Sequence, residues 1–441
     1  MEDTFIIKKE ERSQCTLELP PMVAESLNIK GKKDCTVKFG TKDLLVTLQE
    51  NQKIPRNNLV ISSLCMKELS IPDFPQYQIT MNNNELLIGP YIGILIAKSN
   101  RSLKRKKRRL NKYVEEYPLF SGAILAFSLE GVDPVNQVIY GLMYNPKIHR
   151  WVEGVYPYPG SVFRRISIPK RFKKHFQEQI GNNLFNSTYF SKWTMYQILK
   201  KNPKLVPHLP ITKLYRRPSD LIQFLKKHKR AFLKPVHGLK GRNIKEFEER
   251  NDDYLVRFRK DGTNYIEYIP KEKIEPYLEM HLKPKQNLIQ QKINIIFTEK
   301  KAVDFRLFVL KDQFGGWKCL GWVGREGIQG SVVSNRSSGG KIRGGDELLE
   351  RILGRKKKDL AKLKEKVFSL AYQASIQMEQ SDKNFGYFAI DMAIDTNHHI
   401  WIIEMNHRSP NDGLPLYVNN YRLFQEIKTH NMLYAKYLCG F

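Results

Sequence analysis

Cysteine is scarce in this chain and is not arranged for chemistry. The sequence holds five cysteines, none of them in a C-x-x-C pair: Cys15, Cys35, Cys65, Cys319 and Cys439. Zinc sites use closely spaced cysteines, and disulfide scaffolds use dense, even numbers of them. We therefore expect neither a structural zinc nor a disulfide framework, and the scattered set favours a reducing, intracellular setting.

Long apolar runs are missing as well. No stretch approaches the roughly 20 consecutive apolar residues that span a bilayer, so the sequence predicts no transmembrane segment. The first residues, MEDTFIIKKEERSQ, lack the basic and then apolar regions of a secretion signal. The composition, 441 residues with 41% hydrophobic and 11% aromatic side chains, predicts a folded protein of more than one domain.

Acidic residues are too few to balance the basic ones. The chain has 45 Asp+Glu against 74 Lys+Arg, a formal net charge of +29. Such a charge favours anionic partners such as nucleotides, acidic polymers, nucleic acid or membrane headgroups, although a lysine-rich solvated surface explains it equally well. The densest basic run, residues 101–109, predicts either an arm for nucleic acid or another polyanion, or a solvated linker.

Two segments near the N-terminus repeat each other. Residues 15–48 resemble residues 58–90, and Leu17 matches Leu59 at an offset of 42 positions that the other apolar pairs keep. Each copy predicts a strand, a short helix and a hairpin. Neither copy could bury its apolar face alone, so we expect both to intertwine into one pseudo-symmetric β-barrel, similar to a double-psi barrel. A docking role and a purely structural role both stay open for it.

The pattern changes twice between residues 118 and 230. Residues 118–170 alternate short strands with loops and predict a small open α/β domain. From residue 170 onward the pattern becomes helical, and prolines or polar caps mark the ends of the helices.

A strand that ends at Lys234 leads into a glycine-containing loop, in the stretch AFLKPVHGLKGRNI. The loop carries Gly238, Lys240 and Gly241, and a flexible backbone there could offer N–H groups to a polyphosphate. Lys234 could then contact a phosphate as a point charge. A surface turn is the alternative interpretation of so short a pattern.

Polar residues also interrupt the next apolar strands. LIQQKINII is an apolar strand that carries Gln290, Gln291 and Lys292. AVDFRLFVLKD places Asp304 and Arg306 on one face, because side chains alternate along a strand. A salt bridge between these two residues is the structural alternative. The loop SVVSNRSSGGKIRGG, which holds Asn335, predicts a mobile lid or substrate loop, and a disordered connector is the alternative.

Residues 385–411, FGYFAIDMAIDTNHHIWIIEMNHRSPN, predict two strands joined by a polar turn. Glu404 and Asn406 share a face of the second strand, and Asp391 on the first strand can lie across from Glu404. Two carboxylates and an amide oxygen suit a hard cation, above all Mg²⁺, which combines one or two carboxylates with substrate phosphates. An ordinary hairpin with two solvated acids is the alternative.

In their joint order these pieces resemble the ATP-grasp superfamily over roughly residues 185–420. The order is a Lys-Pro strand with a glycine loop, a strand with a polar hinge, a D-x-R strand, an N-x-x-x-G-G loop, a helix and a D…E-x-N hairpin. AIDMAIDTNHHIWIIEMNHRSP and SNRSSGGKI are similar to strings of peptide- and amino-acid-ligating members. SKWTMYQIL…LPIT and FLKPVHGLKGRNI resemble the YheC/YheD group, whose members are named endospore coat-associated proteins.

The resemblance implies a nucleotide and metal site. The residues that match its magnesium ligands are Asp391, Glu404 and Asn406. Those that match its nucleotide contacts are Lys192, Lys234, Gly238, Lys240, Gly241, Gln290, Gln291, Lys292 and Ile293. Those that match positions near the reacting groups are Arg306, Lys234 and Asn335. Many relatives have an acidic residue where Gln290 stands, so the group that reads the adenine amino group stays open.

The implied fold is α/β (α+β), an ATP-grasp fold preceded by a small α/β domain and the barrel. The predicted segments are 1–97 for the barrel, 98–117 for a basic linker, 118–184 for the small α/β domain, 185–275 for the N-terminal ATP-grasp subdomain, and 276–441 for the C-terminal subdomain with the Mg/ATP site.

The resemblance also implies a ligase that uses ATP and Mg²⁺. A carboxylate would attack the γ-phosphate to give an acyl phosphate, which an amine or a thiol then opens. The expected acceptor is an acidic peptide, a coat protein or another polymer, and the expected location is the mother-cell cytoplasm or the spore coat. Two alternatives stay open: a catalytically silent ATP-grasp scaffold or spore-coat structural protein, and a protein that binds nucleic acid or another polyanion.

Overall fold

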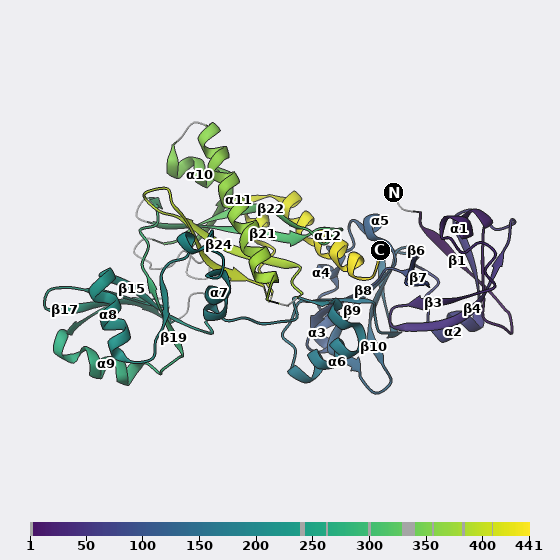
Figure 1. Cartoon of the computed structure of the whole chain (residues 1–441), viewed down its shortest axis with the longest axis horizontal. Helices are drawn as coiled ribbons and strands as arrows, with labels where there is room; N and C mark the ends of the chain where they lie inside the picture. The colour runs from purple at the N-terminus through teal and green to yellow at the C-terminus, as the bar shows by residue number, and fades with distance from the viewer. Residues whose placement is uncertain are drawn as a thin grey trace.

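The computed structural model describes residues 3–238, 243–261, 263–298, 301–328, 340–354, 357–381, 384–407 and 409–441. Within these residues the strands form a closed barrel and three open sheets. Figure 1 shows the barrel at one end of an elongated molecule, the second sheet beside it, and the third sheet at the opposite end. None of the helices that the structure describes is both long and apolar enough to cross a membrane.

The two repeated segments build the barrel, whose strand order is β1-β5-β2-β4-β3-β7-β6. Its elements are β1 (Phe5–Glu10), β2 (Thr16–Leu19), α1 (Pro21–Ser26), β3 (Asp34–Phe39), β4 (Lys42–Glu50), β5 (Asn58–Ser62), α2 (Ser63–Leu69), β6 (Gln76–Asn82) and β7 (Glu85–Gly89). The predicted repeat is confirmed, since β2, α1, β3 and β4 correspond in order to β5, α2, β6 and β7. The copies intertwine because β2 pairs with β5 and β3 pairs with β7, which lets both apolar faces share one core.

The second sheet has the order β11-β10-β9-β8-β12-β13. Its elements are β8 (Tyr91–Ala97), α3 (Asn100–Lys104), α4 (Lys107–Asn111), α5 (Tyr117–Phe120), β9 (Ala123–Asp133), β10 (Val138–Asn145), β11 (Arg150–Pro157), β12 (Ser161–Arg164), α6 (Lys170–Ile180) and β13 (Leu184–Phe185). The basic run falls on α3 and α4, and Leu103, Leu110 and Tyr113 from this stretch are buried against the sheet. The run is therefore folded, with most of its basic side chains exposed.

The third sheet has the order β14-β19-β15-β16-β17-β18 and is antiparallel throughout. It is preceded by α7 (Lys192–Leu199) and contains β14 (Thr212–Leu214), α8 (Pro218–His228), β15 (Arg230–Pro235), β16 (Lys245–Glu249), β17 (Asp253–Lys260), β18 (Thr263–Pro270), α9 (Ile274–His281) and β19 (Asn287–Gln291). Leu221 and Phe224 of α8 and Leu278 of α9 pack on one face of this sheet.

The fourth sheet carries the order β23-β22-β21-β24-β25. Its elements are β20 (Phe297–Thr298), β21 (Lys301–Lys311), β22 (Trp317–Glu326), β23 (Lys341–Gly344), α10 (Gly345–Leu353), α11 (Lys357–Glu379), β24 (Tyr387–Ile394), β25 (Ile400–Asn406) and α12 (Tyr421–Leu438). Helices α7, α10 and α11 contribute to the core on one face, and Leu423 and Ile427 of α12 pack on the other.

These sheets confirm the expected mixture of α and β structure and the N-terminal barrel. The division of the chain into five segments stays a prediction, because strand partners do not tell which segments fold independently.

Candidate functional site

The hairpin of β24 and β25 sets the centre of the site. Its register pairs Asp391 with Glu404 and Ala389 with Asn406. Phe388 and Ile390 of β24 face the core that α7 and α11 complete. Side chains alternate along a strand, so Ala389 and Asp391 face the opposite side of the sheet. The prediction that Asp391 and Glu404 lie across from each other is confirmed.

Two arginines hold the Asp391 carboxylate. Arg306 of β21 donates from Nε and Nη2 to its two oxygens, at 2.7 Å each. Arg325 of β22 lies 3.1 Å from Oδ2 of Asp391 and donates to both oxygens of Asp304 at 2.5 and 2.6 Å. The alternative pairing of Arg306 with Asp304 is therefore replaced by two others, Arg306 with Asp391 and Arg325 with Asp304.

These arginines decide the charge state of the buried acid. Burial by itself raises the pKa of Asp391, but the positive charges of Arg306 and Arg325 outweigh burial and hold that pKa below its ordinary value. Burial lowers the pKa of Arg325, and Asp304 and Asp391 more than compensate, which raises it overall. Asp391 and Arg325 therefore both stay charged at neutral pH.

Lys192 connects the hairpin to the start of the glycine loop. It is the first residue of α7, where Ser191 caps the helix by accepting a hydrogen bond from the Thr194 N–H. Its Nζ lies 3.1 Å from Oε1 of Glu404 and donates to the Gly238 carbonyl at 2.7 Å. The helix start thus places one ammonium group between the acid of β25 and the chain that follows β15.

Lys234 sits near the end of β15 with one hydrogen-bond acceptor. Its Nζ donates to Oε1 of Gln290 at 2.5 Å, and the Gln290 amide donates in turn to the Thr212 hydroxyl at 3.0 Å. Burial is the main reason that the pKa of Lys234 falls to about 8; the charge of Glu404 opposes this shift and the charge of Lys192 adds to it. Lys234 is therefore a poorly solvated cation with little to neutralise it.

The predicted hinge links the third sheet to the fourth. Strand β19 ends at Gln291, and Ile295 already bridges to Asp395 beside β24. Between them Lys292 donates to Oε1 of the buried Glu246 at 2.5 Å, and Ile293 is half-buried. Gln290 and Gln291 both hydrogen-bond within the protein. The stretch therefore crosses between two sheets, as a hinge must.

Three predicted residues, Lys240, Gly241 and Asn335, lie outside the described residues. Of the others, Gln291, Lys292 and Ile293 belong to the crossing between the sheets. Eight converge on one region through the contacts given above: Lys192, Lys234, Gly238, Gln290, Arg306, Asp391, Glu404 and Asn406. Asn406 joins them through an amide N–H that donates to Oδ2 of Asp391 at 3.5 Å.

This donor set fits a cation that arrives with phosphates. Glu404, Asn406 and Asp391 offer only oxygen ligands of the kind that Mg²⁺ takes, but the described residues include no cluster of three or more His, Cys, Asp or Glu that would hold a bare metal ion. The lysines and arginines around the acids are Lys192, Lys234, Arg306 and Arg325, against Asp304, Asp391 and Glu404. A site with more positive than negative side chains attracts a polyphosphate with its metal rather than the metal alone.

Sequence reasoning missed Arg325, Thr212 and Glu246. A signal existed for Arg325, since the hairpin of β21 and β22 pairs it directly with Asp304. Thr212 contacts Gln290, and Glu246 contacts Lys292, because the sheet brings together strands that are distant in sequence. No local sequence pattern predicts such contacts.

A family model and several known proteins are similar to this chain. The model of the family described as YheC/D like ATP-grasp matches residues 181–438. The endospore coat-associated protein YheD of Bacillus subtilis (strain 168) is 25% identical over 449 residues, which covers 98% of this chain and 96% of that protein. The endospore coat-associated protein YheC of the same organism is 25% identical over 224 residues, covering 49% of this chain and 58% of that protein.

Two solved structures are similar at lower identity. A RiPP-associated ATP-grasp ligase of Chryseobacterium gregarium, in complex with ADP and a leader and core peptide, is 13% identical with a TM-score of 0.39, covering 76% of this chain and 95% of that chain. The ATP-grasp ligase PsnB, complexed with a minimal precursor, Mg and ADP, is 11% identical with a TM-score of 0.41, covering 77% of this chain and 98% of that chain. No site residue is carried over from either.

Proposed function

The chain belongs to the YheC/D-like ATP-grasp family, and we propose that it is a Mg²⁺- and ATP-dependent ligase that joins a carboxylate to an amine or a thiol. The observation that carries this proposal is the register of β24 and β25, which sets Asp391 opposite Glu404, within reach of Arg306 and Lys192. This grouping combines oxygen ligands for a cation with donors for phosphate.

The reaction has two balanced steps. A substrate carboxylate oxygen bonds to the γ-phosphorus of ATP while the bond to the β–γ bridging oxygen breaks, which releases ADP and leaves an acyl phosphate. The amine or thiol then attacks the acyl carbon, inorganic phosphate leaves, and the nucleophile loses its proton. Phosphoryl transfer needs positioning and positive charge more than covalent help from the protein.

Glu404, Asn406 and Asp391 would hold the magnesium, which when bound neutralises charge on the phosphates. Lys234 and Lys192 would bind phosphate oxygens, since both ammonium groups lie beside Glu404. Arg306 would orient the transferred group, and its bidentate hydrogen bonds to Asp391 fix its guanidinium in place.

The nucleotide base would bind at the crossing between the third and fourth sheets. Gln290, Gln291, Lys292 and Ile293 would line that end. The loop that starts at Gly238 and continues through Lys240 and Gly241 would cover the phosphates, and Asn335 would lie near the reacting groups. The engagement of Gln290 with Lys234 favours a backbone group of the hinge as the reader of the adenine amino group.

An acidic peptide or coat protein is the proposed acceptor. The net charge of +29 supports an acidic partner, and the two relatives named endospore coat-associated support a location in the mother-cell cytoplasm or at the spore coat.

One observation favours a second candidate, a catalytically silent scaffold. Both oxygens of Asp391 accept hydrogen bonds from Arg306, so part of the capacity of this carboxylate to bind a metal is already used. A scaffold would keep these ion pairs for stability alone.

ADP release separates the two candidates. Purified protein with Mg-ATP is offered glutamate-containing peptides, free amino acids and cysteine, and ADP is followed with a coupled assay. A ligase releases ADP over many turnovers only when a carboxylate and an acceptor are both present, because the acceptor must open each acyl phosphate, and Arg306→Lys lowers that rate. ADP release that no acceptor stimulates, in a protein that binds ATP, would favour the scaffold.

A further inference from the structure

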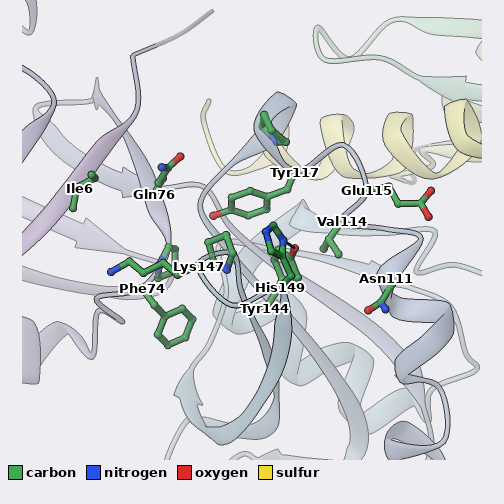
Figure 2. Close-up of a pocket in the computed structure, with 13 residues that line it drawn as sticks. Ile6, Phe74, Gln76, Asn111, Val114, Glu115, Tyr117, Tyr144, Lys147 and His149 are labelled. Carbon is green, nitrogen blue, oxygen red and sulfur yellow. Dashed lines mark hydrogen bonds between the residues drawn. The ribbon is translucent and has the colours of Figure 1, made fainter.

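A separate cavity lies between the barrel and the second sheet, away from the candidate nucleotide site. Its volume is about 550 Å³, within the range of ligand pockets. Ile6 and Phe74 line it from the barrel, Val114 and Tyr117 from the segment after α4, and Tyr144 and Lys147 from the end of β10 and its turn. Figure 2 shows these side chains converging from the two units. None of the residues assigned to nucleotide binding lines it.

The walls of this junction pocket are apolar and held in place. The Tyr117 hydroxyl donates to the Gly122 carbonyl at 2.7 Å, and the Tyr144 hydroxyl lies 3.1 Å from Nδ1 of His149. Both phenols therefore have partners and need no ligand. Three prolines also line the space, Pro75, Pro118 and Pro146. Rings and prolines around a preformed cavity suit a proline or aromatic side chain, as in other peptide-binding grooves.

Basic groups flank the pocket on two sides. Lys147 is exposed at its edge, and its ammonium group donates to the Asp73 carbonyl at 3.3 Å. The one acid of the lining, Glu115, is paired with Lys112. Asn111 ends α4 and lines the pocket, so the exposed Arg108, three residues earlier, lies one turn away on the same side of the helix.

The surface beyond Arg108 stays basic. Glu153 takes two lysines of the run, Lys104 and Lys107. Four exposed arginines have no ion pair with any residue that the structure describes: Arg101, Arg105, Arg108 and Arg109. The exposed side chains of residues 101–109 are therefore complementary to carboxylates rather than to other basic groups.

We propose that the junction pocket is a docking site for an acidic segment of a partner protein, which seats a proline or aromatic side chain in the cavity and lays flanking carboxylates on the α3–α4 arginines and Lys147. Single-stranded nucleic acid is the competing ligand for so basic a surface, and the test below distinguishes it from an acidic peptide. The proposal does not depend on the ligase chemistry.

The test uses the full chain and short synthetic peptides. The probes carry glutamates on both sides of Pro-Pro, Phe-Pro or Tyr-Pro, and a matched peptide has Gly-Ser in place of the anchor. Binding is followed by the methyl resonances of Ile6 and Val114, which line the pocket. We expect saturable shifts for at least one anchored peptide, weaker binding of the Gly-Ser peptide, and affinity that falls with salt.

Variants then locate the interaction. Gln76 is exposed and lines the mouth, so Gln76→Trp should fill the cavity and lower affinity roughly tenfold or more. Arg108→Glu should lower it several-fold through the charge. Leu45→Trp and Lys226→Glu, at exposed positions that do not line the pocket, are the matched controls and should bind as the parent does.

Three results would overturn the proposal. The first is the absence of Ile6 and Val114 shifts with every anchored peptide at millimolar concentration. The second is binding that survives Gln76→Trp unchanged in a variant with the parent's melting temperature. The third is a single-stranded oligothymidylate that shifts the same methyl groups at lower concentration than the peptides, which would assign the surface to nucleic acid.

Discussion

Arg325 lies between two buried acids of the candidate site. It bonds both oxygens of Asp304 and also lies 3.1 Å from Asp391, while its own side chain is only 5% exposed. A guanidinium between two buried carboxylates compensates both charges at once. This residue therefore fixes the positions of the acids on β21 and β24.

We predict that Arg325→Leu destabilises the protein by about 3–5 kcal/mol, because it removes the guanidinium that contacts two buried carboxylates, Asp304 and Asp391. The measurement is the free energy of unfolding in urea. Arg230→Leu is the control, since Arg230 forms a half-exposed pair with Glu248, and pairs of that kind contribute about 1 kcal/mol or less. Equal losses in the two variants would contradict the compensating role of Arg325.

Lys234 gives the site a predicted pH dependence. With a pKa of about 8 its side chain is half neutral at pH 8, and a bound phosphate favours the charged form and so raises the pKa. Nucleotide binding should therefore take up protons near pH 8, and affinity should fall as the pH rises above that value. Calorimetry in buffers of different ionisation enthalpy measures the uptake.

Lys234→Arg is the matched variant for this prediction, because arginine keeps its charge throughout the same range. It should bind nucleotide with no proton uptake near pH 8. Uptake that is the same in the parent and in this variant would mean that another group titrates.

At the residue scale, the sequence predicted the acids better than their partners. Spacing alone placed Glu404 and Asn406 on one face, because strands alternate side chains. The ion pair of Lys192 with Glu404 joins the start of α7 to β25, two elements that lie far apart in the sequence. Only the packing of α7 against the fourth sheet brings them together, so no local pattern could predict it.

At the element scale, local signals gave correct boundaries where they were strong. The helical pattern of residues 346–379 contains one glycine, Gly354, and glycine commonly ends a helix. The structure ends α10 at Leu353 and begins α11 at Lys357, with Gly354 at a φ of +53°, a left-handed conformation that favours glycine.

The basic run was harder to interpret. Its charge predicts either an arm or a linker, yet it forms α3 and α4. The reason is that Leu103 and Leu110 share a core with Met432 and Ala435 of α12, which lies at the other end of the chain. Partners so distant in sequence leave no trace in a local pattern.

Gly324 of β22 permits the close contact between this strand and α10. A Cβ added there would lie 2.2 Å from Cδ2 and 2.9 Å from Cβ of Leu348, so the helix would have to move. We predict that Gly324→Ala lowers the free energy of unfolding by about 1–3 kcal/mol, as overpacked core substitutions do. Thermal unfolding followed by circular dichroism is the measurement.

Gly413→Ala serves as the control for that experiment, because the nearest atom to its added Cβ is 3.5 Å away. Its melting temperature should stay close to that of the parent. A Gly324→Ala protein as stable as this control would show that α10 can move without cost.

At the scale of the whole molecule, α12 connects the second sheet to the fourth, which lie side by side in Figure 1. Tyr434 packs against Phe185 of the second sheet, with ring centroids 5.1 Å apart. Its hydroxyl donates to Oδ1 of Asn384, just before β24, at 2.6 Å. The C-terminal helix thus fixes the second sheet against the fourth, which carries the candidate site.

We predict that Tyr434→Ala lowers the free energy of unfolding by about 3–5 kcal/mol, the usual cost of removing a large buried aromatic side chain. It should also separate the melting of the second and fourth sheets into two calorimetric transitions. Tyr421→Ala, at a position on α12 that is 65% exposed, should leave a melting curve like that of the parent. One unshifted transition in Tyr434→Ala would contradict the coupling role of α12.

The central claim is that the hairpin of β24 and β25 and the end of β15 form a nucleotide site. Its most direct test is the calorimetric titration of the full chain with ATP, with and without Mg²⁺, alongside Glu404→Gln and Lys234→Ala. We predict Mg²⁺-dependent binding in the parent and its loss, by about tenfold or more, in both variants. Absence of binding in the folded parent, or binding that both variants retain, would contradict the account.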